Sequence, residues 1–316
     1  MLSVVGGAVV HSSGCLARVD RFGVEHLGSP ARFTEHTVIP VGSISKTVTA
    51  AVVTALEQRG RLRGSDSIHR FLPELDADPN VTIEDLLRQR TALVDYNDPV
   101  FLSDLGLPGA LSAGAARARV LAAIGRGRVR RGPFGYNNSN YLILGTIAER
   151  AANAPFEALV AGLDPGAGRL AAPEGALPES YVPDVGAFRE SPRGDARVLG
   201  GAGGVRSSAA TLAHLWSALF GRTGSLRTLG AAMRAPSGDS GARSRYARGV
   251  IVDRTGGDEV VWHDGFIEGF SSYAEYRPRG DRVGVIVANT RLDTIQPAAT
   301  EILALARRSP TSRWCA

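Results

Sequence analysis

The order of β-type and helical patterns along the chain is the feature that most restricts its fold. Residues 1–41 and the segment from about 245 to 289 have β-type composition, whereas residues from about 60 to 240 are mainly helical. If both outer segments join one antiparallel sheet, the helical middle of the chain is an insertion that packs against one side of that sheet. The sequence therefore predicts an α+β fold, in which helices flank an antiparallel sheet and a mainly helical subdomain is inserted.

Local signals place the individual elements. Val48, Val52 and Leu56 repeat at four-residue intervals, which predicts a helix that begins near Ser43. Further helices are expected after a capping box at Thr82–Asp85, at Tyr141–Ala152, after Ser208 and at about 294–308. Strands are expected at Tyr246–Val252, Glu259–Trp262, Ser271–Arg277 and Arg282–Asn289, with a hairpin turn at 278–281. The Gly- and Pro-rich stretch 160–200 is predicted to be loop.

The chain length of 316 residues suits one large domain or two interleaved lobes. We expect a single domain over residues 1–316. Its sheet lobe would comprise about 1–59 and 241–316, and its helical lobe about 60–240. Ser43 would then lie at the seam between the lobes, where clefts form.

Composition excludes several functional classes. No stretch approaches 18 uninterrupted apolar residues, so no membrane span is expected. The first residues lack a basic region and a cleavage site, so no signal peptide is expected and the protein is predicted to be cytoplasmic. The pI of about 9.6 would suit a nucleic-acid ligand. However, the arginines are scattered without interleaved aromatic residues, and their densest run, 126–131, is expected to be a solvated loop, so no nucleic-acid partner is predicted.

The two cysteines, Cys15 and Cys315, lie near opposite ends of the chain. They are expected to be free thiols in a reducing compartment, and a disulfide between them is the alternative.

Lys46 is the single lysine among the 36 lysine and arginine residues of the chain. The Ala-, Gly- and Arg-rich composition suggests a GC-rich coding sequence, in which arginine tends to replace lysine wherever only the positive charge matters. A guanidinium stays protonated in proteins, whereas a buried amine can lose its proton and act as a base. Lys46 is therefore a candidate for chemistry, and its survival by chance is the alternative.

Ser43 and Lys46 form an S-x-x-K motif at the start of a predicted helix. Residues three positions apart lie on one face of a helix, so Lys46 can reach the hydroxyl of Ser43. The helix N-terminus also favours negative charge that develops nearby. The motif alone is weak because serines are frequent, but here it contains the only lysine.

Two further segments carry candidate site residues. The Tyr136 phenol can relay protons, and the Asn138 amide can hold a substrate amide or orient the lysine. At an expected strand end, Gly265 would let the backbone approach a substrate, and His263 is a candidate ligand-binding side chain. The structural alternatives are a tyrosine packed on the core beside a turn asparagine, and a histidine with only a structural role.

Together, Ser43-x-x-Lys46, Tyr136-x-Asn138 and His263-x-Gly265 resemble the three motifs of the serine β-lactamase and penicillin-binding protein superfamily. The resemblance covers about residues 35–300. It is closest to the branch of class C β-lactamases and D-alanyl-D-alanine carboxypeptidases, which also contains esterases, D-aminopeptidases and acyltransferases. The segments GYNNSNYLILGTIAER, LGGAGGVRSSAATLAHLWSAL and WHDGFIEGFSSYAEY look like family segments too. A β-lactamase/transpeptidase-like fold is what this similarity implies.

The resemblance also implies a two-step mechanism with an acyl-enzyme intermediate. Ser43 would attack the carbonyl of a small-molecule acyl substrate while Lys46 and Tyr136 take its proton, and Tyr136 would protonate the leaving group. The backbone N–H groups of Ser43 and Phe266 would stabilise the oxyanion. The substrate-binding residues implied are Asn138, His263, Asp264, Gly265 and Phe266. The mechanism needs no metal ion and no organic cofactor.

Three functions remain open at this point. The first is a hydrolase that acts on an ester, amide or lactam. The second is a transacylase of natural-product biosynthesis, which passes the acyl group from Ser43 to an amine or alcohol acceptor. The third is a ligand-binding protein that has lost catalysis, and the retention of Lys46 argues against it.

Asp264 occupies the middle position of the third motif. In relatives with K-T-G or H-T-G, this motif helps to bind a substrate carboxylate. If Asp264 faces the cleft, it would repel a carboxylate; if it points to the other face of the strand, it would contact an arginine. The segment 84–96 also departs from the family, which usually has H-T-S-G-L there. Gln89, Arg90, Thr91 and Ala92 fill the first four of those places. These departures leave the substrate more open than the chemistry.

Overall fold

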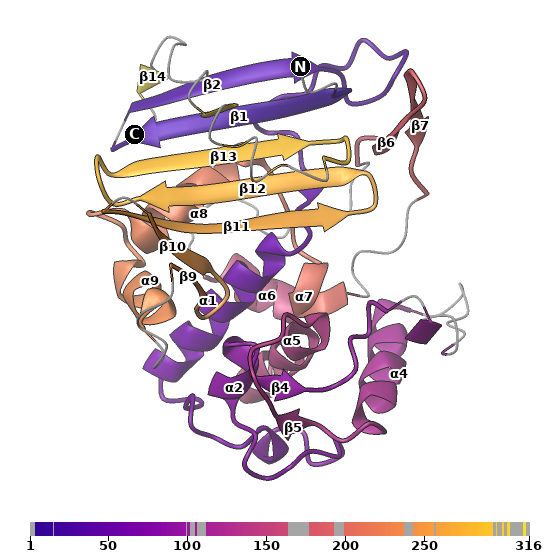
Figure 1. Cartoon of the computed structure of the whole chain (residues 1–316), viewed down its shortest axis with the longest axis vertical. Helices are drawn as coiled ribbons and strands as arrows, with labels where there is room; N and C mark the ends of the chain where they lie inside the picture. The colour runs from indigo at the N-terminus through magenta and orange to yellow at the C-terminus, as the bar shows by residue number, and fades with distance from the viewer. Residues whose placement is uncertain are drawn as a thin grey trace.

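The computed structural model has two parts, an antiparallel sheet and a group of helices beside it (Figure 1). The described residues are 4–14, 16–98, 100–101, 105, 112–163, 177–192, 199–236, 243–255, 257–292, 295, 299, 302–303 and 312–313. The antiparallel strand pairing and the helices beside the sheet agree with the predicted α+β fold class.

The large sheet has eight strands in the order β14-β2-β1-β13-β12-β11-β10-β9, and each neighbouring pair is antiparallel. Its strands are β1 (Gly6–Ser13), β2 (Leu16–Gly23), β9 (Ser244–Tyr246), β10 (Ile251–Thr255), β11 (Asp258–Ile267), β12 (Phe270–Arg277), β13 (Arg282–Ala288) and β14 (Ser312–Arg313). The pairing of Gly7 with Ala288 joins β1 to β13. The two outer segments therefore share one sheet, as the sequence predicts.

Side chains of β1 alternate between two hydrophobic clusters, one on each face of the sheet. Val10 packs in the large core that also contains Val48 of the first long helix. Val9 packs in a smaller cluster with Ile286 and Leu292 on the opposite face. Since successive strand residues point to opposite faces, a strand buried on both sides must be apolar throughout, which explains the run Ala8–Val10.

Helices of four to fifteen residues form most of the second part of the molecule. They are α1 (Ile44–Gln58), α2 (Ile83–Leu87), α4 (Ala113–Gly125), α5 (Asn138–Ala152), α6 (Phe156–Ala161), α7 (Gly200–Gly203), α8 (Ala209–Phe220) and α9 (Arg227–Arg234), with a 3-10 turn η1 (Ile68–Arg70). Three short strand pairs complete the described elements: β3 (Ile39–Pro40) with β8 (Arg206–Ser207), β4 (Thr91–Ala92) with β5 (Arg130–Arg131), and β6 (Tyr181–Asp184) with β7 (Ala187–Glu190).

Helix α1 runs through the centre of the molecule (Figure 1). Every residue from Ile44 to Leu56 is buried. The helix packs against α5, α7, α9 and β11, so its sides are covered and it needs no polar stripe. Because α1 begins beside β11 and then enters the helical part, its first residues lie where the two parts meet.

Several local predictions are confirmed. Thr82 accepts a hydrogen bond from the backbone N–H of Asp85 and the Asp85 side chain accepts one from that of Thr82, which completes the capping box of α2. Ser208 caps α8 by accepting from the N–H of Thr211. The expected hairpin turn is closed by a hydrogen bond from the Asp281 N–H to the Pro278 carbonyl.

Other predicted boundaries are wrong. Helix α5 begins at Asn138 rather than Tyr141, because the Asn137 side chain caps it by accepting from the Ser139 N–H. Strand β11 extends to Ile267, so the third motif lies inside the strand and not at its end. The strand expected at 246–252 is two strands that are separated by a turn with Gly249 at φ 70°.

The stretch predicted to be loop contains two elements where it is described. The hairpin of β6 and β7 joins Tyr181 to Glu190, and Tyr181 also pairs with Thr290 in an isolated bridge. Composition hid this hairpin because Pro and Gly interrupt any alternating pattern. Of the helix expected at 294–308, residues 295, 299, 302 and 303 are helical, and the other positions lie outside the described residues. Cys15 and Cys315 also lie outside them.

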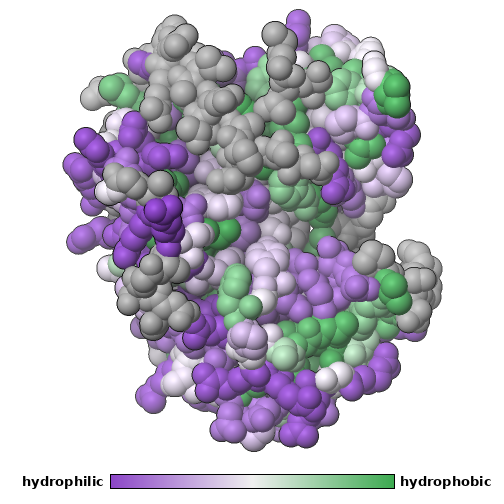
Figure 2. Space-filling model, viewed as in Figure 1, coloured by the Kyte–Doolittle hydropathy of each residue, from purple (hydrophilic) through white to green (hydrophobic). Residues whose placement is uncertain are grey.

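Hydrophilic residues cover much of the described surface in Figure 2, and hydrophobic residues appear in several areas, one of them over the helical part. None of the described helices has the length and apolar character required to cross a bilayer.

Candidate active site

The first turn of α1 brings Ser43 and Lys46 together. Ser43 precedes the helix as its N-cap residue, and Lys46 follows one turn later. The ammonium nitrogen Nζ of Lys46 lies 3.0 Å from Oγ of Ser43, within hydrogen-bond distance. The structure thus places this predicted pair as the i, i+3 spacing requires.

Lys46 is fully buried, and its Nζ has two further acceptors. It donates to Oδ1 of Asn138 at 2.7 Å and to the backbone carbonyl of Ala202 at 3.0 Å. Burial lowers the pKa of Lys46 from 10.5 to about 7, while the carboxylates of Asp95 and Asp264 oppose this shift. The amine can therefore lose its proton near neutral pH.

The three partners of Lys46 suit a base. A neutral amine has two N–H donors and one lone pair. If the donors stay on Asn138 and Ala202, the lone pair points at the hydroxyl of Ser43. Proton transfer from Ser43 then turns Lys46 into an ammonium group that donates to both acceptors and to the serine oxygen.

We expect kcat/KM to rise with pH through a midpoint near 7, because the base form of Lys46 appears above its pKa. Asp95 raises the pKa of Lys46, so Asp95→Asn should move the midpoint to lower pH. A series of initial rates from pH 5 to 9 for both proteins measures the shift. A flat profile, or a shift to higher pH in Asp95→Asn, would contradict this assignment.

Tyr136 lies just before α5, and its ring lies beside the Lys46 amine. Nζ of Lys46 is 4.9 Å from the centre of the Tyr136 ring, which also meets the rings of Tyr246 at 5.8 Å and His263 at 6.3 Å. The residue as a whole is 44% exposed. Its hydroxyl end is buried, however, and this raises the pKa of Tyr136 well above 10, although a hydrogen bond with Ser43 opposes the rise. Tyr136 is thus a neutral phenol in the free protein.

Two glycines let the start of α1 and strand β11 approach closely. A Cβ on Gly265 would lie 2.1 Å from the Val41 carbonyl and 2.9 Å from the Ser43 nitrogen. A Cβ on Gly42, whose φ is 50°, would lie 2.8 Å from the Phe266 nitrogen. The backbone nitrogens of Ser43 and Phe266 therefore flank the same narrow space, as two oxyanion donors must.

His263 and Asp264 lie on β11 and have different environments. His263 is buried, its Nδ1 lies 2.6 Å from the Asp264 carbonyl, and burial lowers its pKa to about 3, so it is a neutral donor at that nitrogen. The Asp264 side chain remains 27% exposed, and burial raises its pKa. No described arginine lies within ion-pair distance of it, so the arginine contact considered from the sequence is not formed among the described residues.

The segment around β4 holds the second motif in place, a role that the sequence did not reveal. Both carboxylate oxygens of Asp95 accept hydrogen bonds from Nδ2 of Asn138, at 3.2 and 3.1 Å. These bonds fix the amide so that its oxygen faces Lys46. Ser139 donates to the Val94 carbonyl at 2.7 Å. The segment that departs from the family pattern is thus part of the support for the site.

Gln89 forms hydrogen bonds with the residues on both sides of Tyr136. It is fully buried with φ 59°, a left-handed conformation that is costly for a residue with a side chain. Its carbonyl accepts from the Gly135 N–H at 2.9 Å, and its Oε1 accepts from the Asn137 N–H at 3.1 Å and from Nδ2 of Asn140 at 2.6 Å. Strain held by a buried side chain beside a reactive residue indicates a positioning role.

Gln89→Ala should lower kcat about tenfold or more, because the Asn137 N–H loses its acceptor and Tyr136 loses a fixed position. It should also lower the free energy of unfolding by about 1–3 kcal/mol, the cost of buried polar groups left without partners. Rates measured well below the melting temperature separate the two effects. Gln58→Ala, at the exposed end of α1, is the matched control and should leave both quantities near wild type. A wild-type kcat in Gln89→Ala would contradict the role.

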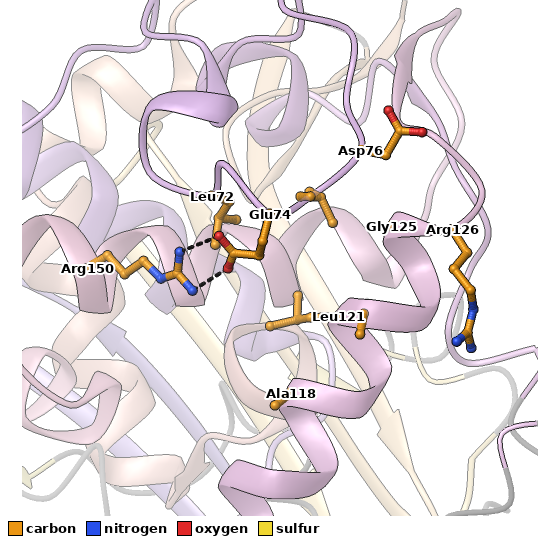
Figure 3. Close-up of a pocket in the computed structure, with 10 residues that line it drawn as sticks. Leu72, Glu74, Asp76, Ala118, Leu121, Gly125, Arg126 and Arg150 are labelled. Atoms are coloured by element: carbon orange, nitrogen blue, oxygen red, sulfur yellow. Dashed lines mark hydrogen bonds and ion pairs between the residues drawn. The ribbon is translucent and has the colours of Figure 1, made fainter.

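A separate hollow of about 570 Å³ lies between the segment 72–76 and α4 (Figure 3). Arg150 and Glu74 form a two-bond ion pair at its wall. None of the predicted catalytic residues lines it. Among the described residues, no three His, Cys, Asp or Glu side chains gather as a metal site.

The three motifs thus meet at one place, and a comparison with known families identifies the chain. The sequence profile described as Beta-lactamase matches residues 2–307. The chain belongs to the beta-lactamase family. This agrees with the resemblance drawn from the motifs.

Solved structures share the fold of this beta-lactamase family member. A D-stereospecific amidohydrolase from Streptomyces sp. is 21% identical with a TM-score of 0.72, over 94% of each chain. A β-lactamase/D-alanine carboxypeptidase from Pseudomonas syringae is 18% identical with a TM-score of 0.76, over 97% of this chain and 95% of that one. A D-amino acid amidase from Ochrobactrum anthropi SV3, complexed with L-phenylalanine amide, is 16% identical with a TM-score of 0.73, over 96% and 91%.

Proposed function

We propose that the protein is a serine hydrolase that cleaves an amide, ester or lactam of a small molecule through an acyl-Ser43 intermediate. The observation that carries this proposal is the buried Lys46, whose Nζ lies 3.0 Å from Oγ of Ser43. Membership of the beta-lactamase family and the amidohydrolase and amidase neighbours support a serine hydrolase.

In the acylation step, Oγ of Ser43 attacks the substrate carbonyl carbon, and its proton passes to Nζ of Lys46. The oxyanion that forms accepts hydrogen bonds from the backbone N–H groups of Ser43 and Phe266. Loss of one such donor costs roughly 10²–10³ in rate. When the bond to the leaving group breaks, the leaving group takes a proton from the phenol of Tyr136, and Lys46 returns a proton to Tyr136.

In the second step, a water molecule attacks the acyl carbon while the same groups take its proton. Collapse of the second tetrahedral species releases the acid and returns the proton to Oγ of Ser43, so the protein is restored. Asn138 keeps the Lys46 amine aimed at Ser43 throughout, because its own amide is held by Asp95. The Y-x-N second motif favours a class C-like form of this chemistry.

Mass spectrometry of the intact protein tests the proposal. Incubation with p-nitrophenyl esters, aminoacyl p-nitroanilides and nitrocefin should yield a transient adduct on the Ser43 peptide with at least one substrate. Products formed with and without an added amine then show whether water or the amine resolves the intermediate. Turnover without any adduct on Ser43, or no reaction with any substrate class, would overturn the proposal.

A further inference from the structure

Asp264 lies close to the site through its neighbour on β11: its Oδ1 is 3.9 Å from Nδ1 of His263, whose ring centre lies 6.3 Å from that of Tyr136. His263 and Gly265 point toward α1, since His263 is buried and a Cβ on Gly265 would strike the Val41 carbonyl. Asp264 and Phe266 start from the other face of β11 and remain partly exposed, and the Asp264 carboxylate nevertheless stays within 3.9 Å of the His263 ring. Asp264 thus lies two residues from the Phe266 N–H assigned to the oxyanion.

The open side of β11 makes this position accessible. Strand β10 pairs with β11 only as far as Trp262. From His263 onward, β12 is the only neighbouring strand described for β11 in the large sheet. Asp264 therefore lies on a strand segment with one free edge, beside the reactive serine.

The Asp264 carboxylate has no cationic partner in the described part of the chain. Its ion contact is with Nδ1 of His263 at 3.9 Å, and that ring is neutral because of its low pKa. The negative charge of Asp264 acts on both catalytic groups, since it raises the pKa of Lys46 and of Tyr136. Asp95 acts on both residues in the same direction.

The site therefore holds two carboxylates around one amine that is only partly protonated at neutral pH. A substrate carboxylate beside Asp264 would be repelled, whereas an ammonium group would gain a charge-assisted hydrogen bond and would favour the ionised form of the acid.

We propose that Asp264 binds an ammonium group of the substrate, so that the acyl donors are amides or esters of compounds with a free amino group close to the scissile carbonyl. This inference rests on the proposed function, because the ammonium group belongs to the acyl part of the substrate that Ser43 would attack. It gives the aspartate of the third motif a specificity role.

Matched acyl donors test the inference in the full-length protein. Both enantiomers of phenylalanine p-nitroanilide carry the ammonium group, 3-phenylpropionic p-nitroanilide lacks it, and the N-acetyl compound masks it. The corresponding methyl esters form a second series. We expect the better phenylalanine enantiomer to exceed the deamino compound about tenfold or more in kcat/KM, as expected for one charge-assisted hydrogen bond. Equal rates would overturn the inference, whereas absence of any acyl-Ser43 with these compounds and also with the p-nitrophenyl esters and nitrocefin would overturn the proposed function itself.

Asp264→Asn removes the charge and keeps the shape of the side chain. The ratio of the two kcat/KM values should fall to about one in this variant, and any general effect on the catalytic groups cancels in that ratio. Asp258→Asn is the matched control, because Asp258 lies on the same strand and its side chain is 32% exposed, against 27% for Asp264. It should keep the wild-type ratio. A wild-type ratio in Asp264→Asn would overturn the inference.

Binding to the Ser43→Ala protein gives a readout that does not depend on acylation. Calorimetry should show tighter binding of phenylalaninamide than of 3-phenylpropionamide, and Asp264→Asn in the same background should abolish the difference. Equal binding of both amides without the second substitution would also overturn the inference.

Discussion

Ser43→Ala should lose at least about 10⁴-fold in kcat and should form no covalent adduct. Removal of the nucleophile leaves only binding and oxyanion stabilisation, and losses of this size or larger are known when a serine nucleophile is removed. The fold should persist, because Ser43 is only half-buried and Lys46 keeps Asn138 and Ala202 as partners. Steady-state rates and the mass of the intact protein measure the two effects.

Ser45→Ala is a sharp control for the nucleophile, because it lies two residues away in the same turn. Oγ of Ser45 accepts a hydrogen bond from the Val205 N–H at 3.0 Å in the core. Its loss should cost about 1–3 kcal/mol of stability and leave the adduct on Ser43 intact. An adduct that disappears in Ser45→Ala and remains in Ser43→Ala would show that the assignment of the nucleophile is wrong.

Lys46→Arg should reduce the acylation rate by roughly 10²–10⁴, the range for loss of a general base. Arginine keeps the positive charge, but it does not lose its proton in proteins, so it cannot accept the proton of Ser43. The guanidinium must also fit a site that is closed to solvent, where Ser43, Asn138 and Ala202 surround the smaller amine. Single-turnover acylation by a p-nitrophenyl ester measures the rate directly.

Two comparisons make the lysine experiment decisive. Lys46→Ala should be impaired to a similar degree, since both variants lack the base. Arg70→Lys exchanges the same two residue types at a site where the side chain is 61% exposed and pairs with Asp66. This control should keep near-normal rates. If Lys46→Arg also acylates at a near-normal rate, Lys46 serves only as an electrostatic anchor.

The parts of the site that depend on short-range geometry could be predicted from the sequence. Ser43 and Lys46 are one helical turn apart, so their contact follows from the helix alone. A close backbone approach at Gly265 was expected from the lack of a side chain, but a substrate was the expected neighbour, and the structure shows the start of α1 there. In both cases the chemical type of the residue restricts its role, whichever way the rest of the chain folds.

The parts that depend on tertiary contacts could not be predicted. Gln89 and Asp95 act through hydrogen bonds to residues more than forty positions away, and no spacing rule connects them to Tyr136 or Asn138. The left-handed backbone of Gln89 has no signal in the sequence, because glutamine rarely adopts it. The direction of Asp264 remained open until the length of β11 and the burial of His263 had fixed which side chains face α1.

The pairing of β1 with β13 also determines when this protein can fold during synthesis. Gly7 meets Ala288 and Ser13 meets Arg282, so the centre of the sheet joins two segments that are far apart in the chain and are made at different times during translation. Contacts of such long range are slow to form, because a large loop must close first. Until β13 leaves the ribosome, the hairpin of β1 and β2 has an unpaired and largely apolar edge. We therefore expect slow refolding, and aggregation of chains truncated before residue 282, as a consequence of a sheet that joins two distant segments of the chain.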